Sequence, residues 1–264
     1  MVISILGCGW YGKALAIEFL KKGITVRGST TSPQKLEVLN ADGIIPCLID
    51  LSPENKIIDP DFFKCDVLWV CIPPKARAGK GLEYIVQLKE LTTIIKEKGI
   101  QQVVLISSTG VYGDNNSVVT EIYEPNPDSN AGKILLEAEG ILTRETSFTT
   151  TIIRFAGLIG PGRDPGRFFA GKTNIPNGDA PVNLIHLRDC LGLSYAIIEK
   201  QAFGNIYNAV APQHPTRAEF YTKAAECSSL EKPQFIDEKN SWKIIESVNV
   251  PSRLGYIYKV NLTE

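Results

Sequence analysis

The sequence lacks several features that would place a protein in a class at once. No apolar stretch is long enough to cross a bilayer, and no basic segment precedes the apolar N-terminal residues as in a secretory signal. Charges of opposite sign nearly balance, with 28 Lys and Arg against 29 Asp and Glu, so no basic field indicates nucleic acid. We therefore expect a cytoplasmic protein that binds neither membranes nor nucleic acids.

Patterns typical of metal and redox sites are missing as well. The two histidines, His186 and His214, lie far apart in sequence, so we expect no metal site. None of the six cysteines forms a C-x-x-C pair, and several fall in expected strands, which favours buried free thiols in a reducing compartment. A chain of 264 residues can form a substantial core without metals or disulfides.

The most informative segment that is present is a glycine motif near the N-terminus. An apolar run at 2–6 leads directly into Gly7, Gly9 and Gly12, spaced as G-x-G-x-x-G, and a helical pattern follows at 13–22. The first glycine permits a tight turn, the second lets a pyrophosphate approach the backbone, and the third allows close packing of helix and sheet. A glycine-rich turn that binds nothing is the alternative. Because strand, motif and helix are in register, the segment favours dinucleotide binding at a helix N-terminus.

Strand and helix patterns alternate through the first 155 residues. Further strands are expected at 24–27 (ending at Gly28), 44–51, 66–72, 102–107 and 150–154, and helices after Ser32 and Pro33 and at 82–98 and 133–144. Such alternation predicts an α/β fold, a doubly wound parallel Rossmann sheet with a small C-terminal substrate lobe. We expect residues 1–155 to form the NAD(P)-binding domain. Residues 156–264 would form the lobe, partly interleaved with that domain and not independent.

Several downstream segments support a family resemblance. They read SSTGVYG at 107–113, RFAGLIGPGR at 154–163, NLIHLRD at 183–189 and IYNA at 206–209. In this order, and with the N-terminal glycines, the chain resembles the extended short-chain dehydrogenase/reductase family over residues 2–227, most closely its atypical NAD-dependent epimerase/dehydratase members. The resemblance implies a nicotinamide cofactor, a small-molecule and often nucleotide-sugar substrate, and a homodimer formed through the helices at 82–98 and 133–144.

The resemblance also implies a catalytic group that this chain lacks. In the family, a Ser or Thr after the fifth strand orients the substrate, the Tyr of Y-x-x-x-K transfers a proton, and its Lys binds the nicotinamide ribose. Ser108, or Thr109 beside it, matches the first position and Lys133 matches the lysine, but Ser129 stands where the Tyr should be. A serine hydroxyl is a poor proton acceptor near neutral pH. Ser129 is therefore either a helix cap or, with Lys133 and a bound water, part of a proton relay.

Cofactor choice depends on the segment after the second strand. NAD-binding proteins usually carry an acid there, for the ribose 2′-hydroxyl, and this chain has none. Ser29 and Thr30, helped by Arg27 or Lys35, suit a 2′-phosphate, which favours NADP over NAD. The expected cofactor-binding residues, several of them from the resemblance, are Gly7, Gly9, Trp10, Tyr11, Gly12, Ser29, Thr30, Asp50, Leu51, Pro73, Pro74, Ser107 and Lys133.

On the substrate side, Arg163 and Arg167 lie in a loop rich in Gly and Pro. Two guanidinium groups on such a scaffold suit a pyrophosphate or a carboxylate, although a solvated loop is an equally simple interpretation. With Thr109, they are the expected substrate-binding residues. His186 and Asp189 are expected to tie the lobe to the cofactor domain.

Two functional hypotheses follow. The first is an NAD(P)-binding oxidoreductase, epimerase or dehydratase that acts by hydride transfer on a small polar or nucleotide-sugar substrate, with Ser108, Lys133 and Ser129 as catalytic candidates. The alternative is a non-catalytic dinucleotide-binding redox sensor or regulatory module, because Ser129 replaces the tyrosine.

Overall fold

A seven-stranded parallel sheet forms the centre of the molecule, in a computed structural model that describes residues 1–263. Its strand order is β10-β7-β5-β4-β1-β2-β3. The strands are β1 (Val2–Leu6), β2 (Thr25–Thr30), β3 (Ile45–Leu48), β4 (Val67–Val70), β5 (Gln102–Ser108), β7 (Thr149–Phe155) and β10 (Ile206–Ala209). The predicted doubly wound α/β fold is confirmed.

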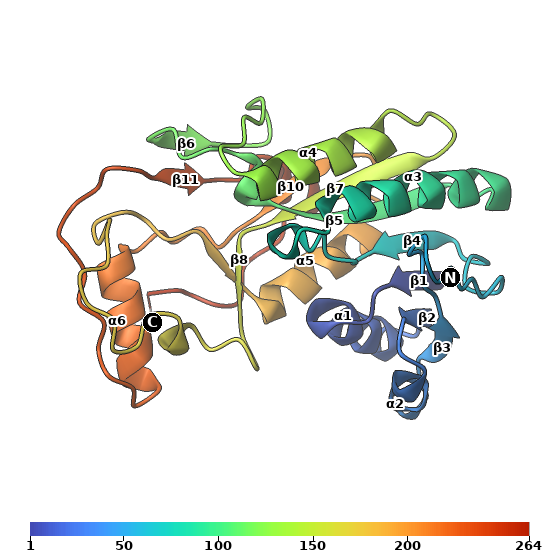
Figure 1. Ribbon diagram of the computed structural model, residues 1–264, viewed down its shortest axis with the longest axis horizontal. Coiled ribbons are helices and arrows are strands. Elements are labelled where there is room, and N and C mark those ends of the chain that lie inside the picture. The colour runs from blue at the N-terminus through green and yellow to red at the C-terminus, as the bar shows by residue number, and fades with distance from the viewer. Residues whose placement is uncertain (264) are drawn as a thin grey trace.

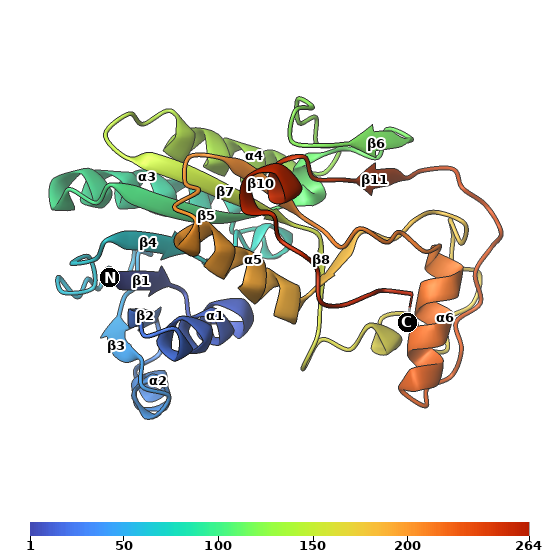
Figure 2. The same ribbon diagram turned by 180° about the vertical axis from the view of Figure 1, so that it is seen from behind.

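Helices cover both faces of this sheet. Helices α3 (Gly81–Lys98) and α4 (Asn130–Thr143) lie on one face, and α1 (Trp10–Lys21) and α5 (Leu187–Glu199) lie on the other, as Figure 1 and Figure 2 show from opposite sides. Side chains of β4 alternate between the two cores: Trp69 packs against Phe19 of α1, with ring centroids 5.4 Å apart, while its neighbours Leu68 and Val70 face the α3 core. Because both faces are covered, the strands read as continuous apolar runs.

The strand order reverses beside β1. The chain builds β1, β2 and β3 in one direction and then returns to place β4 on the other side of β1. In doubly wound sheets, ligands bind outside the carboxyl ends of the strands at such a switch point. The fold therefore places the ligand crevice over the ends of β1 and β4, directly at the glycine motif.

A smaller lobe lies at one end of the sheet. It contains β6 (Ser117–Val119) beside β11 (Lys243–Ile245), β8 (Gly157–Ile159) beside β9 (Leu184–His186) and helix α6 (Arg217–Cys227). The described residues also form five short helical turns. The turns are η1 (Pro33–Lys35), η2 (Ala76–Ala78), η3 (Thr109–Val111), η4 (Pro165–Arg167) and η5 (Val250–Leu254), with α2 (Leu36–Ala41) following η1, and not all belong to the lobe. Figure 1 shows α6 far from α2, at the opposite end of the molecule.

The lobe and the sheet are connected by segments of chain that pass from one to the other. β10 comes from the part of the sequence expected to form the lobe, yet it pairs with β7 in the main sheet. Near the C-terminus, Asp189 of α5 accepts hydrogen bonds from the backbone N–H groups of Lys259 (2.6 Å) and Val260 (3.1 Å) and from the hydroxyl of Tyr256 (2.9 Å). The division at residue 155 stays a prediction; the structure shows how closely its two parts are interleaved.

Several element boundaries differ from expectation. Strand β2 does not end at Gly28 but runs through it to Thr30, because Ser29 and Thr30 continue the pairing with β3. A Cβ on Gly28 would lie 2.6 Å from both Cys8 Sγ and Ile44 Cγ2. The missing side chain thus makes room for packing rather than ending the strand. Helix α1 begins at Trp10, three residues early, and α4 begins at Asn130, so Lys133 lies within the helix rather than at its start. Within residues 1–263, no helix has the length and apolar character to span a membrane.

Candidate functional site

Two neighbouring cavities open over the carboxyl ends of β1 and β4. We call the larger, of about 520 Å³, the β2 cavity, because it extends over β2 and β3. The smaller, of about 280 Å³, is the β5 cavity, because it extends over the end of β5. Both share five lining residues, which are Gly7, Gly9, Ile72, Pro73 and Pro74. The two cavities are therefore two ends of one cleft that meet at the glycine loop.

The glycine loop is closed toward the protein and open toward the cleft. A Cβ on Gly12 would lie 2.2 Å from the carbonyl oxygen of Gly7, whereas the Cβ position of Gly9 has no atom within 4 Å. Gly7 has a φ of 98°, and its N–H donates to the buried hydroxyl oxygen of Ser29 at 2.9 Å. The first N–H groups of a helix have no acceptor within it, so the start of α1 presents donors and a positive dipole end to the cleft.

Hydroxyl and charged side chains line the β2 cavity. Lys35 lines it, and residues 29–34, which precede Lys35, contain no carboxylate. Asp50 lines it as well, and its Oδ1 accepts a hydrogen bond from the N–H of Ser52 at 2.9 Å. Thr30 Oγ1 likewise accepts from the N–H of Ser32 at 3.1 Å. Every expected cofactor residue except Lys133 lines one cavity or the other.

The sequence did not single out five residues that complete the β2 cavity. They are Lys75, Lys80, Glu83, Tyr84 and Gln87, from the start of α3 and the turn before it. The hydroxyl of Tyr84 is buried and has no hydrogen-bond partner in the described chain, and burial raises its pKa. An orphaned hydroxyl at a cavity wall is a group that a ligand can satisfy. From the sequence alone, this segment indicates only a helix with a polar and an apolar face, and not a cavity wall.

Apolar side chains dominate the β5 cavity. Tyr11, Leu135, Phe155 and Leu158 line it, together with Trp10, Cys71, Ser107, Ser108 and Arg163. Burial raises the pKa of the Cys71 thiol, which stays neutral, and that of the Tyr11 phenol, which is hydrogen-bonded to Ser194 Oγ at 2.6 Å. Ser108 Oγ accepts from the N–H of Gly110 at 3.1 Å, so its own proton is left to donate.

Helix α4 presents an apolar face to this cavity. Leu135 lines the cavity, and the residue one turn earlier on the same face is Ala131. Lys133 is exposed and lines neither cavity. Lys133 of the expected pair with Ser129 therefore lies off the face of α4 that lines the β5 cavity, and Leu135 occupies that face.

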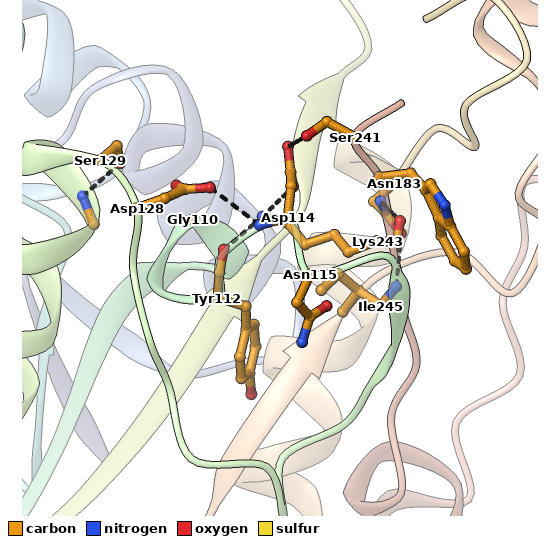
Figure 3. A network of polar contacts seen from close by, with 12 residues as sticks. Gly110, Tyr112, Asp114, Asn115, Asp128, Ser129, Asn183, Ser241, Lys243 and Ile245 are labelled. Atoms are coloured by element: carbon orange, nitrogen blue, oxygen red, sulfur yellow. Dashed lines mark hydrogen bonds and ion pairs between the residues drawn. The ribbon is translucent and has the colours of Figure 1, made fainter. Parts of the chain in front are cut away.

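The hydroxyl of Ser129 caps α4. Its Oγ accepts a hydrogen bond from the N–H of Gly132 at 3.1 Å, as the cap interpretation expected (Figure 3). Figure 3 also shows how the loop after β5 is held to β11: Lys243 Nζ lies 3.0 Å from Asp114 Oδ1 and donates to the carbonyl oxygen of Tyr112 at 2.5 Å. Asn183 in turn accepts from the N–H of Ile245 at 2.8 Å. This network anchors the segment that carries Ser108 to the lobe.

A buried ion pair supports the floor of the β5 cavity. Arg154 and Glu139 lie 2.6 Å apart with side chains only 3% and 4% exposed. Glu139 also accepts from Ser107 Oγ at 2.6 Å, and Arg154 donates to the hydroxyl of Tyr112 at 2.6 Å. Burial lowers the pKa of Arg154, but the hydrogen bonds and charge of Glu139 outweigh it and raise that pKa overall. Tyr112 is thus bound within the protein, and burial raises its pKa.

The expected substrate residues are not brought together. Arg163 lies at the mouth of the β5 cavity, whereas Arg167 is 79% exposed, pairs with Asp164 at 3.6 Å and lines neither cavity. Thr109 is buried and lines neither cavity. Among the described residues, no group of three His, Cys, Asp or Glu side chains could hold a metal ion.

Comparison with known proteins shows similarity over nearly the whole chain. No protein-family model matches. Protein YeeZ of Escherichia coli strain K12 is 38% identical over 264 residues, which cover 97% of this chain and 95% of that protein. A conserved protein of unknown function from Silicibacter pomeroyi DSS superposes with a TM-score of 0.82, at 21% identity and over 99% of this chain and 95% of its own.

A UDP-glucuronic acid 4-epimerase from Bacillus cereus, solved in complex with NAD, also has the same fold. It superposes with a TM-score of 0.81 at 18% identity, over 100% of this chain and 93% of its own. At this level of identity the likeness establishes the architecture, and residues of the cleft must carry any statement about ligands.

Proposed function

Because the chain belongs to the family of Escherichia coli protein YeeZ and has the extended short-chain dehydrogenase/reductase fold, we propose that it binds a nicotinamide dinucleotide. The observation that carries the proposal is the cleft itself, in which two cavities meet at a glycine loop with open space above Gly9. The adenosine would lie in the β2 cavity, the diphosphate over the start of α1, and the nicotinamide in the β5 cavity. The epimerase from Bacillus cereus, which has the same fold and was solved with NAD, supports the proposal that a nicotinamide dinucleotide binds.

The variant Gly9→Ala tests dinucleotide binding without disturbing the fold. Gly9 has a φ of −78°, which any residue adopts, and its Cβ would meet no protein atom within 4 Å. The methyl group would instead occupy the space above the loop that a diphosphate needs. We expect about a tenfold or greater loss of NADPH affinity, measured by nicotinamide fluorescence, at unchanged thermal stability. Wild-type protein that bound neither NADPH nor NADH would contradict the proposal.

We also propose a preference for NADP. The wall that faces the adenosine ribose carries Thr30 and Thr31 with Lys35, a combination that suits a 2′-phosphate. Lys35→Ala should lower the ratio of NADPH affinity to NADH affinity severalfold while leaving NADH binding unchanged. A ratio near one in the wild-type protein would overturn the preference.

The bound nicotinamide would supply hydride transfer, and we propose that the protein uses it on a small polar substrate as an oxidoreductase or epimerase. Ser108 is the group that supports this function, because its free proton can be donated to a substrate oxygen beside the ring. Ser108→Ala should then abolish cofactor turnover while leaving NADPH affinity unchanged. The assay is a panel of small carbonyl and hydroxyl compounds followed by nicotinamide absorbance.

A second candidate function is a dinucleotide-binding redox sensor. The apolar pair Ala131 and Leu135 favours it, since no Tyr or Lys side chain faces the β5 cavity from α4. Tight NADPH binding without turnover across the whole panel would identify the sensor. The paired variant Ala131→Tyr/Leu135→Lys sharpens the choice, because a gain of turnover would show that only the proton-transferring pair is missing.

We also propose that the protein lies in the cytoplasm, because all six cysteines are free thiols.

We further propose a homodimer, because helix α3 exposes Leu82 (79%) and Val86 (49%) on the outside of the α3–α4 layer. Replacing both residues by Glu should give a monomer in sedimentation experiments, whereas Ile257→Glu, at an equally exposed site elsewhere, should not. A wild-type monomer at micromolar concentration would overturn the dimer.

A further inference from the structure

A stacked pair of side chains stands at the mouth of the β5 cavity. The indole N–H of Trp10, the first residue of α1, donates to the carbonyl oxygen of Pro161 at 2.7 Å. The guanidinium carbon of Arg163 lies 4.3 Å from the centroid of the Trp10 ring. A residue of the glycine loop thereby fixes both the substrate-side loop and its cationic side chain, although the two segments are distant in sequence.

The loop that carries Arg163 is held in a single tight turn. Gly160 and Arg163 exchange two backbone hydrogen bonds, of 3.2 Å and 2.8 Å. The turn depends on glycine, because Gly160 has a φ of 138° and Gly162 a φ of 76°. The turn fixes the backbone at Arg163, and the contact with Trp10 orders its side chain, which lowers the entropic cost of binding a ligand with it.

No carboxylate neutralises this guanidinium within residues 1–263. Arg163 takes part in none of the ion pairs there, whereas Arg167, four residues on, pairs with Asp164. Arg163, an exposed residue, is also the one charged side chain among the described residues that line the β5 cavity, and Ser108 lines the same cavity. A guanidinium held over an aromatic ring retains N–H groups that can bind a two-oxygen acceptor such as a carboxylate or a phosphate.

We propose that the substrate is a small molecule with an oxyanion, carboxylate or phosphate, which Arg163 binds while Ser108 meets the reacting oxygen. This inference rests on the proposed function, since it assumes a nicotinamide in the same cavity. With about 280 Å³ to hold both the ring and the substrate, the β5 cavity favours a compact acid over a nucleotide sugar. The dinucleotide diphosphate has its own donors at the start of α1 and needs no further cation.

Calorimetry on the NADPH-loaded protein tests the proposal. The probes are inorganic phosphate and a small keto acid, pyruvate, titrated at constant ionic strength into wild-type protein, Arg163→Gln and the matched control Arg167→Gln. We expect at least one probe to bind the wild type, and Arg163→Gln to weaken that binding about tenfold or more. Arg167→Gln should leave it unchanged, because that side chain lies outside the cavity and already has a carboxylate partner.

The dissociation constant of NADPH, measured in the same three proteins, separates the remaining outcomes. If Arg163→Gln weakens NADPH about tenfold, Arg163 serves the dinucleotide diphosphate and the substrate assignment is wrong. Equal binding of the anion by Arg163→Gln and wild type, or no anion binding by the wild type at millimolar concentration, also overturns the proposal. A wild type that binds no NADPH is a failure of the proposed function instead, and the titration shows this before any anion is added.

Discussion

The β2 cavity and the β5 cavity share the glycine loop but offer a ligand different walls. The first is lined by hydroxyls, by lysines and by the carboxylates of Asp50 and Glu83, and the buried Tyr84 hydroxyl has no hydrogen-bond partner within the described residues. The second is mostly apolar, with Ser108 and Arg163 as its accessible polar groups. Under the proposed function, the walls of the first cavity suit a dinucleotide, whereas no Tyr or Lys side chain of α4 lines the second.

Breaking the ion pair beneath the β5 cavity should have the largest effect. Glu139→Leu leaves the guanidinium of Arg154 buried without its partner, so we expect a loss of about 3–5 kcal/mol in the free energy of unfolding, measured with urea. The matched double variant Glu139→Leu/Arg154→Met removes both charges and should lose much less. Equal losses in the two variants would show that shape rather than charge supports this side of the cleft.

The second largest effect is expected from a side chain on Gly12, on the side of the glycine loop that packs against the protein. Gly12→Ala places a methyl group 2.2 Å from the Gly7 carbonyl oxygen, a backbone atom that cannot move aside cheaply. We expect a stability loss of about 1–3 kcal/mol together with weaker NADPH binding. Gly9→Ala is the comparison, because it should lower affinity alone. If both variants lost stability equally, the loop would not have the one open side that the structure shows.

The anchor of the loop on the β2 side should matter less. Ser29→Ala removes the acceptor of the Gly7 N–H and leaves that group buried, at a cost of about 1 kcal/mol. Thr30→Ala, at the next residue, is the control for stability, since within the protein its hydroxyl accepts only from the N–H of Ser32 in a turn. Urea unfolding of both variants measures the difference, and a larger loss of stability for Thr30→Ala would contradict this account of the loop.

The same contrast separates the features that the sequence alone could predict from those that it could not. The roles of Gly7, Gly9 and Gly12 follow from local backbone geometry, and the strand and helix on either side repeat the signal. The face of α4 that meets the cleft depends instead on how the helix packs, so Lys133 matched a spacing without facing the cavity. Arg163 and Arg167 share a loop and a chemistry, and only the structure distinguishes them: Arg163 lies over the Trp10 ring and lines the β5 cavity, whereas Arg167 pairs with Asp164.

The smallest predicted effect concerns α5, which supports α1 from below through the bond between Tyr11 and Ser194. His186 caps α5, because its Nδ1 accepts from the N–H of Arg188 at 3.1 Å, and burial, aided by the charge of Arg188, lowers the pKa of the His186 imidazole below its ordinary 6.5. The unfolded chain therefore takes up the proton first as pH falls. The stabilising contribution is complete above pH 6.5 and is lost between that pH and the lower pKa of the folded state.

The variant His186→Asn measures this loss directly, because Asn is a good cap acceptor that does not titrate in this range. Thermal midpoints recorded from pH 7.5 down to pH 5 should fall more steeply for the wild type than for His186→Asn, with the two curves parallel above pH 6.5. Helix α5 lies beneath α1 and contacts the cleft only through that helix. The affinity for NADPH should therefore show the same small dependence on pH as the thermal midpoint. Parallel curves over the whole range would mean that the imidazole stays neutral or is free to turn away, and the cap would then contribute nothing that depends on pH.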